Sequence, residues 1–343
     1  MYRAICVLLA GLGIAQAVPR EGIAVSPQKE PPDSAERVNM TRLQIFLDRA
    51  NFRPGKIDGL GGEFTQKALD RYNIVNGLPQ GTLPEATEAS PYREYVIAEE
   101  DSKWVGPQAR SPAEQEKLKG LLYADYWELV AERFHCDKGF LQELNPGVTE
   151  LKPGVTLRVP DAPEFIMADV VALEKKRLAE KKAKAAPSPS PADAAALPTP
   201  TATPSPTPNP RRIVLSREQR LIEVFEGDKL LACFPCTPGS KDTPVPPGTW
   251  KVTANILMPY YRWDKSVLDS GVRSENAFNL PPGPNNPVGI VWMALNRPSV
   301  GMHGTTSPDQ IGRNESHGCI RLANWDAFLL SQLIDKGVSV EVQ

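Results

Sequence analysis

The sequence predicts a multidomain protein with a mainly-β C-terminal domain, preceded by a small α-helical module and a small α+β module. Three observations support this fold class. The 343 residues exceed the length of one average domain. Residues 187–210 hold nine prolines in 24 positions, which is typical of an extended linker. Apolar residues recur at helical spacing before this segment, whereas short apolar runs bounded by Gly and Pro follow it.

The composition excludes two broad classes. The net charge of -2 lacks the basic footprint of a general nucleic-acid binder, so we expect no nucleic-acid partner. No apolar run reaches the length of about 20 residues that a transmembrane helix requires, so we expect no integral membrane span.

The N-terminus has the pattern of a secretory signal peptide. Arg3 precedes an apolar stretch over residues 4–14, and Ala15-Gln16-Ala17 supplies a small-x-small cleavage site. We therefore interpret residues 1–17 as a signal and expect the mature chain in the periplasm or cell envelope.

The helical module is expected over residues 38–85. Leu43, Phe46, Leu47 and Ala50 recur at helical spacing; a loop over residues 51–59 follows, and then Phe64, Ala68, Leu69 and Tyr72 share a second helix face. A generic helical hairpin would explain this pattern. The matches Leu43-Gln44, Pro54-Gly55, Asp58-Gly59 and Thr65 to Leu69 resemble the small peptidoglycan-binding domain, which implies peptidoglycan as a partner.

The α+β module is expected over residues 116–161. Leu129, Val130 and Phe134 favour one helix, and Phe140, Leu141 and Leu144 favour another. With Asn145-Pro146-Gly147 and the Leu151 to Pro160 segment, the module resembles a LysM domain of β-α-α-β pattern. Its front half departs from that family, because Tyr123 to Leu129 replaces the usual start. Glycan binding and a purely structural remnant both remain open.

Residues 165–211 are predicted to be a charged helix followed by the proline-rich linker. The basic side chains of residues 174–184 could attract an anionic polymer, or the helix could be a solvated stalk. Either way the segment is expected to act as a long spacer. We then expect residues 212–343 to act without the N-terminal half.

The C-terminal domain is expected over residues 212–343. Its predicted strands lie near residues 213–215, 221–225, 230–234, 246–252, 288–295 and 338–342, with a hairpin turn at 226–229. Asn324 is expected to cap one late helix that carries Trp325, Phe328, Leu329 and Leu333 inward and stops before Gly337.

Cys233 and Cys236 have the spacing of a redox motif but continue an apolar strand rather than open a helix. Buried core thiols are therefore the favoured interpretation, with a short disulfide or a redox role as alternatives.

The candidate catalytic residues lie close together near the C-terminus. His303 and His317 are two of only three histidines, and both lie within sixteen residues of Cys319. A cysteine attacks as its thiolate, and an imidazole can accept its proton or pair with the thiolate. Gly318 allows a close approach of the backbone, and the N–H groups of Gly318 and Cys319 could form an oxyanion hole.

This cluster has two other interpretations. The His-x-Cys spacing with a distant His could hold zinc, but a close fourth ligand is lacking, so no metal and no cofactor is expected. A core His pair beside a buried Cys would account for the residues without chemistry, although such pairs rarely have so many glycine and polar neighbours.

Ser316-His317-Gly318-Cys319-Ile320-Arg321, with His303-Gly304 upstream and the Thr243 to Thr249 segment, closely resembles the L,D-transpeptidase catalytic domain. The resemblance covers residues 213–342. It implies a β-sandwich-like fold, Cys319 as nucleophile and His303 as general base, with Ser316, His317, Gly318 and Gly304 in supporting or oxyanion roles. Arg321 would organise the motif or meet a carboxylate. Spacing alone leaves His317 open as the base.

The resemblance further implies a peptidoglycan stem peptide as substrate. Cys319 would release D-alanine from a donor tetrapeptide and form a thioester, which an amine of a neighbouring stem would resolve into a crosslink between diamino acids. Water as acceptor would give an L,D-carboxypeptidase, depending on the loop around Tyr260, Tyr261 and Trp263. A wall-binding scaffold would lack Cys319 or His303, and a general cysteine peptidase would carry its Cys on a helix.

Overall fold

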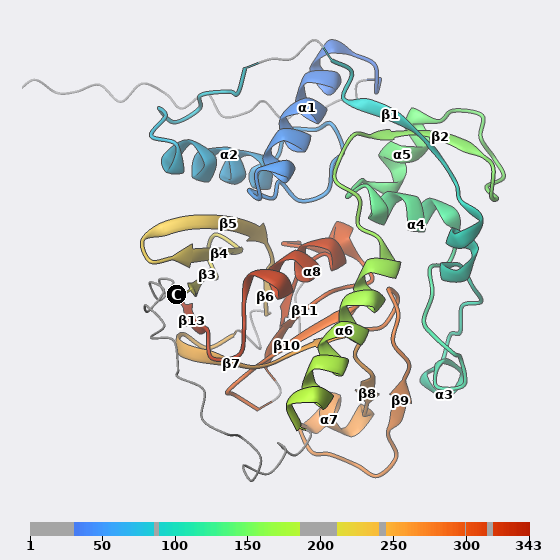
Figure 1. Cartoon of the computed structure of the whole chain (residues 1–343), viewed down its shortest axis with the longest axis vertical. Helices are drawn as coiled ribbons and strands as arrows, with labels where there is room; N and C mark the ends of the chain where they lie inside the picture. Colours follow the sequence, from blue (N-terminus) through green and yellow to red (C-terminus); the bar gives the residue numbers. More distant parts are fainter. Residues whose placement is uncertain (1–30, 86–88, 186–210, 240–244, 299, 314–317) are drawn as a thin grey trace, which may run out of the picture.

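The computed structural model describes residues 31–85, 89–185, 211–239, 245–298, 300–313 and 318–343. The predicted signal peptide and proline-rich linker, together with Ser316 and His317, lie outside these residues. In Figure 1 the N-terminal elements lie along one side of a β-rich C-terminal domain. No helix among the described residues is long and apolar enough to cross a membrane.

The helical module consists of α1 (Ala35–Arg49) and α2 (Glu63–Val75). Ser34 caps α1, since its side chain accepts a hydrogen bond from the Arg37 N–H. The predicted apolar positions Leu43, Leu47, Ala68 and Leu69 are buried, which confirms the helical periodicity.

The second module has the order β1 (Tyr92–Val96), η1 (Glu99–Trp104), α3 (Pro112–Gln115), α4 (Tyr126–Arg133), α5 (Lys138–Leu144) and β2 (Thr156–Pro160). β1 and β2 pair antiparallel, with η1 and three helices, α3, α4 and α5, between them in the chain. The first strand lies upstream of residue 116, where the sequence pattern placed the start. The segment from Tyr126 is helical because Asp125 caps α4 through a hydrogen bond to the Glu128 N–H.

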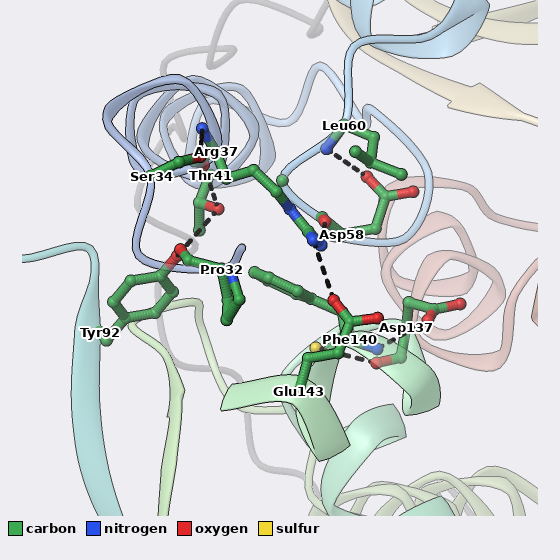
Figure 2. A network of polar contacts seen from close by, with 12 residues as sticks. Pro32, Ser34, Arg37, Thr41, Asp58, Leu60, Tyr92, Asp137, Phe140 and Glu143 are labelled. Atoms are coloured by element: carbon green, nitrogen blue, oxygen red, sulfur yellow. Dashed lines mark hydrogen bonds and ion pairs between the residues drawn. The ribbon is translucent and has the colours of Figure 1, made fainter. Parts of the chain in front are cut away.

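A buried arginine joins these two modules (Figure 2). The Arg37 guanidinium donates to the Asp58 carbonyl oxygen at 2.7 Å and forms an ion pair with Glu143 at 2.9 Å. It also lies over the Phe140 ring, 4.6 Å from the centroid. Because a buried charge is costly without partners, these contacts fix α1 against α5.

The charged helix α6 (Met167–Ala185) does not stand as a free stalk. Val170 is buried, and Arg177 donates to the Ser331 carbonyl oxygen at 3.0 Å and to Asn255 at 3.4 Å. Since Asn255 and Ser331 belong to the C-terminal domain, α6 lies along that domain before the linker begins (Figure 1).

The C-terminal domain is built on one nine-stranded sheet. The predicted strands appear as β3 (Arg211–Ser216), β4 (Leu221–Glu226), β5 (Lys229–Pro235), β7 (Gly248–Leu257), β10 (Val291–Leu295) and β13 (Ser339–Val342). Three strands that periodicity did not predict complete the sheet: β6 (Thr237–Pro238), β11 (Gly301–His303) and β12 (Ile320–Arg321). The order is β5-β4-β3-β13-β7-β10-β11-β12-β6.

The sheet wraps around a core because its two edges are consecutive in the chain. β5 ends at Pro235 on one edge, and β6 begins at Thr237 on the other, with only Cys236 between them. β7 lies at the middle, where Gly248–Lys251 pair with β13 and Val252–Leu257 pair with β10. This closure agrees with the expected sandwich-like fold.

Three further elements complete the domain. β8 (Tyr261–Trp263) and β9 (Phe278–Leu280) form a separate hairpin-like pair around α7 (Lys265–Ser270), a helix that the sequence did not predict. The expected late helix is α8 (Asn324–Leu333). The expectation that Asn324 caps it is wrong: Ala323 occupies the cap, and the buried Asn324 amide instead contacts the Pro284 carbonyl oxygen and the Ile290 N–H.

The helical module extends the open edge of β5. The Arg53 N–H donates to the Cys233 carbonyl oxygen at 2.9 Å, and the Cys233 N–H donates to Asn51 at 3.0 Å. Leu47, Leu69 and Leu230 then share one apolar cluster with Cys233.

Cys233 and Cys236 are buried free thiols, and burial raises the pKa of Cys233 to about 12. A redox role for the pair is thus not supported.

Candidate functional site

The parallel pairing of β11 with β12 brings the two predicted catalytic segments together. Met302 lies opposite Ile320, and His303 lies opposite Arg321. Met302 and Ile320 are fully buried in the core, so His303 and Arg321 share the other face of the pair. Cys319 directly precedes β12, two residues before Arg321. This one strand pairing thus brings together the segments of His303 and Cys319, which lie sixteen positions apart in the sequence.

The His303 ring is fixed on two sides. Its Nδ1 lies 2.6 Å from the Gly304 carbonyl oxygen, and its plane stacks on Trp292 with centroids 5.6 Å apart. Because a carbonyl oxygen only accepts, Nδ1 carries the proton and Nε2 keeps a lone pair. Burial and, to a smaller extent, the Arg321 charge lower the pKa of His303 to about 4, although the hydrogen bond to Gly304 acts to raise it. The imidazole is therefore neutral near pH 7 and able to accept a proton at Nε2.

The Cys319 thiol is half-buried. Burial raises its pKa, and this is offset in part by a hydrogen bond from the Gly301 backbone and by the Arg321 guanidinium. The resting thiol is therefore protonated near neutral pH. Because both the thiol and the imidazole are neutral at rest, the proton would be transferred during nucleophilic attack rather than beforehand in a thiolate–imidazolium pair.

Arg321 also lines a polar cavity of about 390 Å³. Hydroxyl and amide side chains line the cavity, among them Thr237, Asn285, Thr305, Gln310 and, from α3 of the N-terminal half, Gln115. Tyr261 lies near the sulfur, since burial and then the Cys319 charge raise the pKa of its hydroxyl. Tyr261 is one of the loop residues that the sequence singled out.

Gly318 has φ of +91°, a left-handed conformation that side-chain-bearing residues rarely adopt. The glycine before the cysteine is thus required by the backbone. Ser316 and His317, which the sequence predicted to support the site, lie outside the described residues.

The N-terminal half supports the loop that leads to Cys319. Gly312 has φ of +72°, and a Cβ there would lie 2.3 Å from the Phe64 ring of α2. The Gly312 N–H donates to the Thr237 hydroxyl at 2.8 Å, and Arg220, which also pairs with Glu63, donates to the Gly312 carbonyl oxygen.

The first turn of α8 lies behind the site and is held by the N-terminal half. Asn324 lies near the buried carboxyl of Glu132 on α4 and opposes the rise of its pKa, and Trp325 stacks on His135. Arg53 lies 3.5 Å from Asp326 and also pairs with Asp48. Burial raises the pKa of Asp326 to about 8, whereas Arg53 and His135 overcome burial to lower the pKa of Asp48 to about 2.

Sequence reasoning did not assign Trp292 or Gln115 to the site, and it gave Asn324 only a helix-capping role. Trp292 pairs with His303 across two strands, so only the register of β10 and β11 reveals it. Gln115 lies more than two hundred residues from Cys319, and no local pattern marks it.

Comparison with known proteins identifies the same region. Residues 210–342 match the family model YkuD, described as the L,D-transpeptidase catalytic domain. The candidate L,D-transpeptidase YkuD of Bacillus licheniformis is 28% identical over 131 residues, which cover 38% of this chain and 64% of that protein. The candidate L,D-transpeptidase YbiS of Escherichia coli is 30% identical over 141 residues, covering 38% of this chain and 43% of that protein.

A solved L,D-transpeptidase from Mycobacterium smegmatis is 22% identical, with a TM-score of 0.32 over 39% of this chain and 58% of that one. The chain thus spans less than two thirds of the length of these proteins, and the matches leave the N-terminal half aside. The C-terminal part of the chain, residues 210–342, is similar to the catalytic domain of the L,D-transpeptidases.

Proposed function

We propose that the protein is an L,D-transpeptidase that acts on peptidoglycan stem peptides through a thioester on Cys319. The observation that carries the proposal is a neutral, ring-stacked His303 with Nδ1 held by Gly304, on the strand paired with the one that follows Cys319. This arrangement suits a general base for a thiol.

The reaction proceeds in two acyl transfers. Nε2 of His303 accepts the thiol proton while sulfur attacks the carbonyl carbon at the L-centre of the diamino acid. The C–N bond to the terminal D-alanine breaks, its nitrogen takes the proton from His303, and a thioester remains. An amine of a second stem then attacks the thioester and loses a proton to His303, and the C–S bond breaks to release the Cys319 thiolate, which takes that proton back from His303. Backbone N–H groups of Gly318 and Cys319 would stabilise the oxyanion.

We further propose that the chain is exported and works in the cell envelope, with the helical module and the LysM-like module facing peptidoglycan. The substrate proposal supports this assignment, because a polymeric substrate outside the cytoplasm requires an exported enzyme. The signal-like residues 1–17 agree with it.

The test is intact mass spectrometry of the protein mixed with purified tetrapeptide muropeptides or with a carbapenem. An adduct on the wild type, absent from Cys319→Ala of equal folded stability, is the expected result. Chromatography of the products then separates crosslinked dimers from a shortened monomer, which would indicate water as acceptor. An adduct on another residue, or none on a folded protein, would overturn the proposal.

A further inference from the structure

The loop over residues 304–313 follows directly after His303 and forms part of the wall of the polar cavity. Five of its residues line the cavity, namely Thr305, Thr306, Ser307, Gln310 and Ile311. The near end of the loop is fixed by the sheet. The Gly304 N–H donates to the Val291 carbonyl oxygen at 3.3 Å, and the Leu322 N–H donates to the His303 carbonyl oxygen at 2.9 Å. The shape of this wall therefore depends on what fixes the far end of the loop.

Gly312 is held at that far end by contacts from three parts of the chain. Its N–H donates to the Thr237 hydroxyl at 2.8 Å, and its carbonyl oxygen accepts a hydrogen bond from Arg220. Its φ is +72°, and a Cβ there would overlap the Phe64 ring of α2. The Phe64 ring thus lies directly against the glycine, while Thr237 and Arg220 hold the peptide groups on its two sides.

The first turn of α2 also fixes Arg220. Glu63 pairs with the Arg220 guanidinium, whose carbon lies 5.8 Å from the centroid of the Phe64 ring. One turn along the helix, Lys67 pairs with Glu63 and donates to the Gln219 carbonyl oxygen at 2.7 Å. This turn of the helical module therefore holds both the far end of the cavity loop and the connection between β3 and β4 that carries Arg220.

The ion pair between Glu63 and Arg220 contributes more to position than to stability. The Glu63 side chain is 46% exposed and the Arg220 side chain 36% exposed. Ion pairs this exposed add little to folding stability, because solvent screens the charges and two long side chains lose freedom. What the pair determines is the direction of the guanidinium, and with it the place of the Gly312 carbonyl oxygen.

We propose that Phe64 and Glu63 are positioning residues for the donor peptide, which act through Gly312 on the wall of the cavity. The inference rests on the proposed function and adds the helical module to the part of the protein that accepts the donor. Without the Phe64 ring, the far end of the loop would relax into the space that the ring leaves. The donor would then be held less accurately against Cys319, and a displacement of about 1 Å in such a complex costs roughly a hundredfold in rate. The near end stays on the sheet, so His303 keeps its geometry.

The experiment measures two rates on the same protein. One is the acylation of Cys319 by a soluble tetrapeptide muropeptide, and the other is its alkylation by iodoacetamide, a small reagent that needs no cavity. In Phe64→Ala the acylation rate should fall roughly tenfold to a hundredfold, whereas the alkylation rate should stay as in the wild type. Glu63→Gln should lower the ratio of acylation to alkylation by a smaller factor, because Arg220 keeps its bond to Gly312.

Two variants on the same helix are the matched controls. Tyr72→Ala removes a ring that packs on Phe46 and Phe52, and Arg71→Gln removes an ion pair with Glu223 of β4. Both changes weaken contacts that α2 makes with other elements. The ratio of acylation to alkylation should therefore stay at the wild-type value in both.

Gly312→Ala tests the contact itself. The added methyl group should overlap the Phe64 ring and slow acylation, but it should slow acylation less in the Phe64→Ala background, where the space is free. The strain of a positive φ is the same in both backgrounds and cancels in this comparison.

An unchanged ratio of acylation to alkylation in a folded Phe64→Ala, or equal losses from Gly312→Ala in both backgrounds, would overturn the inference. Should Phe64→Ala fail to fold, Glu63→Gln replaces it and must lower the ratio. Should the muropeptide not acylate the wild type at all, the proposed function fails separately. Hydrogen exchange then still tests the positioning, because the amides of residues 305–313 should exchange faster in Phe64→Ala than in Tyr72→Ala. Equal exchange in the two variants would overturn it.

Discussion

The imidazole of His135 stacks on the indole of Trp325, with centroids 5.3 Å apart and planes 14° from parallel. His135 belongs to the N-terminal half, and Trp325 to the first turn of α8 behind the catalytic strands. With the Arg53–Asp326 and Glu132–Asn324 contacts on either side, this pair makes the two halves one packed structure.

The isolated fragment 212–343 should therefore be unstable. Without the N-terminal half, the fragment exposes Trp325, Leu230 and Cys233, which are buried in the whole structure. Each large apolar side chain returned to water costs about 1.5–3 kcal/mol. We expect a lower thermal midpoint and faster proteolysis than for residues 31–343, measured by calorimetry and limited trypsin digestion. A fragment as stable and as readily acylated as the longer chain would restore the interpretation of independent, tethered modules.

Acylation should have its acid limb well below the ordinary range of histidine. Because burial lowers the pKa of His303 to about 4, the base is already free at pH 5. The rate should then be nearly constant between pH 5.5 and 7.5. A limb near the ordinary value of about 6.5 would show that the imidazole is solvated during the reaction.

His303→Ala should lose roughly a hundredfold or more of the acylation rate near pH 7, the range for a general base. Part of the rate should return at alkaline pH, where the thiol ionises without help. His317→Ala should lower the rate without that alkaline recovery. The reverse pattern in the two pH profiles would assign the base to His317.

Glu132→Gln should flatten the dependence of folding stability on pH. Burial raises the pKa of Glu132 from 4.5 to about 8, so the folded state holds a proton that the unfolded state releases. The associated stability is complete below pH 4.5 and is lost as the pH rises to about 8. The variant should reduce this decline by up to about 1.4 kcal/mol per pH unit, measured by urea unfolding between pH 5 and 8. The pKa of Asp326 is raised in the same direction, so part of the decline of stability with pH should persist in the variant. Equal slopes of stability against pH in the wild type and in Glu132→Gln would contradict a buried neutral carboxyl at Glu132.

Alkylation should distinguish the cysteines of the described chain. Cys136, Cys233 and Cys236 are buried, and burial raises the pKa of each thiol, whereas Cys319 is half-buried beside a base. Iodoacetamide at pH 7.5 should modify Cys319 in the folded protein and the other three only in urea. Peptide mapping gives the answer, and early labelling of Cys233 would show that the helical module leaves β5.

Local patterns were sufficient for the elements that carry their own periodicity. The alternation at Val338, Val340 and Val342 and the hairpin around residues 226–229 predicted β13, β4 and β5, and the sequence pattern around Cys319 led to the paired segment with His303. Strands of two or three residues, such as β6 and β12, are too short to show a period.

The docking of the two halves could not be predicted for a different reason. Arg53 and Asp326 are separated by 273 positions, and each is an ordinary charged residue in its own segment. Asn324 has the residue type of a helix cap, but tertiary contacts at Pro284 and Ile290 outweigh that local preference. The proline-rich linker predicted two separate halves. In the structure, however, two segments that precede the linker, α6 and the loop with Arg53, pack against the C-terminal domain that follows it.

The backbone bonds between Asn51, Arg53 and Cys233 have a geometric consequence for a polymeric substrate. A flexible tether would bring an enzyme near its polymer but leave every approach angle open. Here the loop between α1 and α2 continues the sheet edge, so the helical module and the reactive cleft keep one separation and one relative orientation. Under the function proposed above, a glycan strand bound by the helical module would present its stem peptides to Cys319 from one side and at a constant distance.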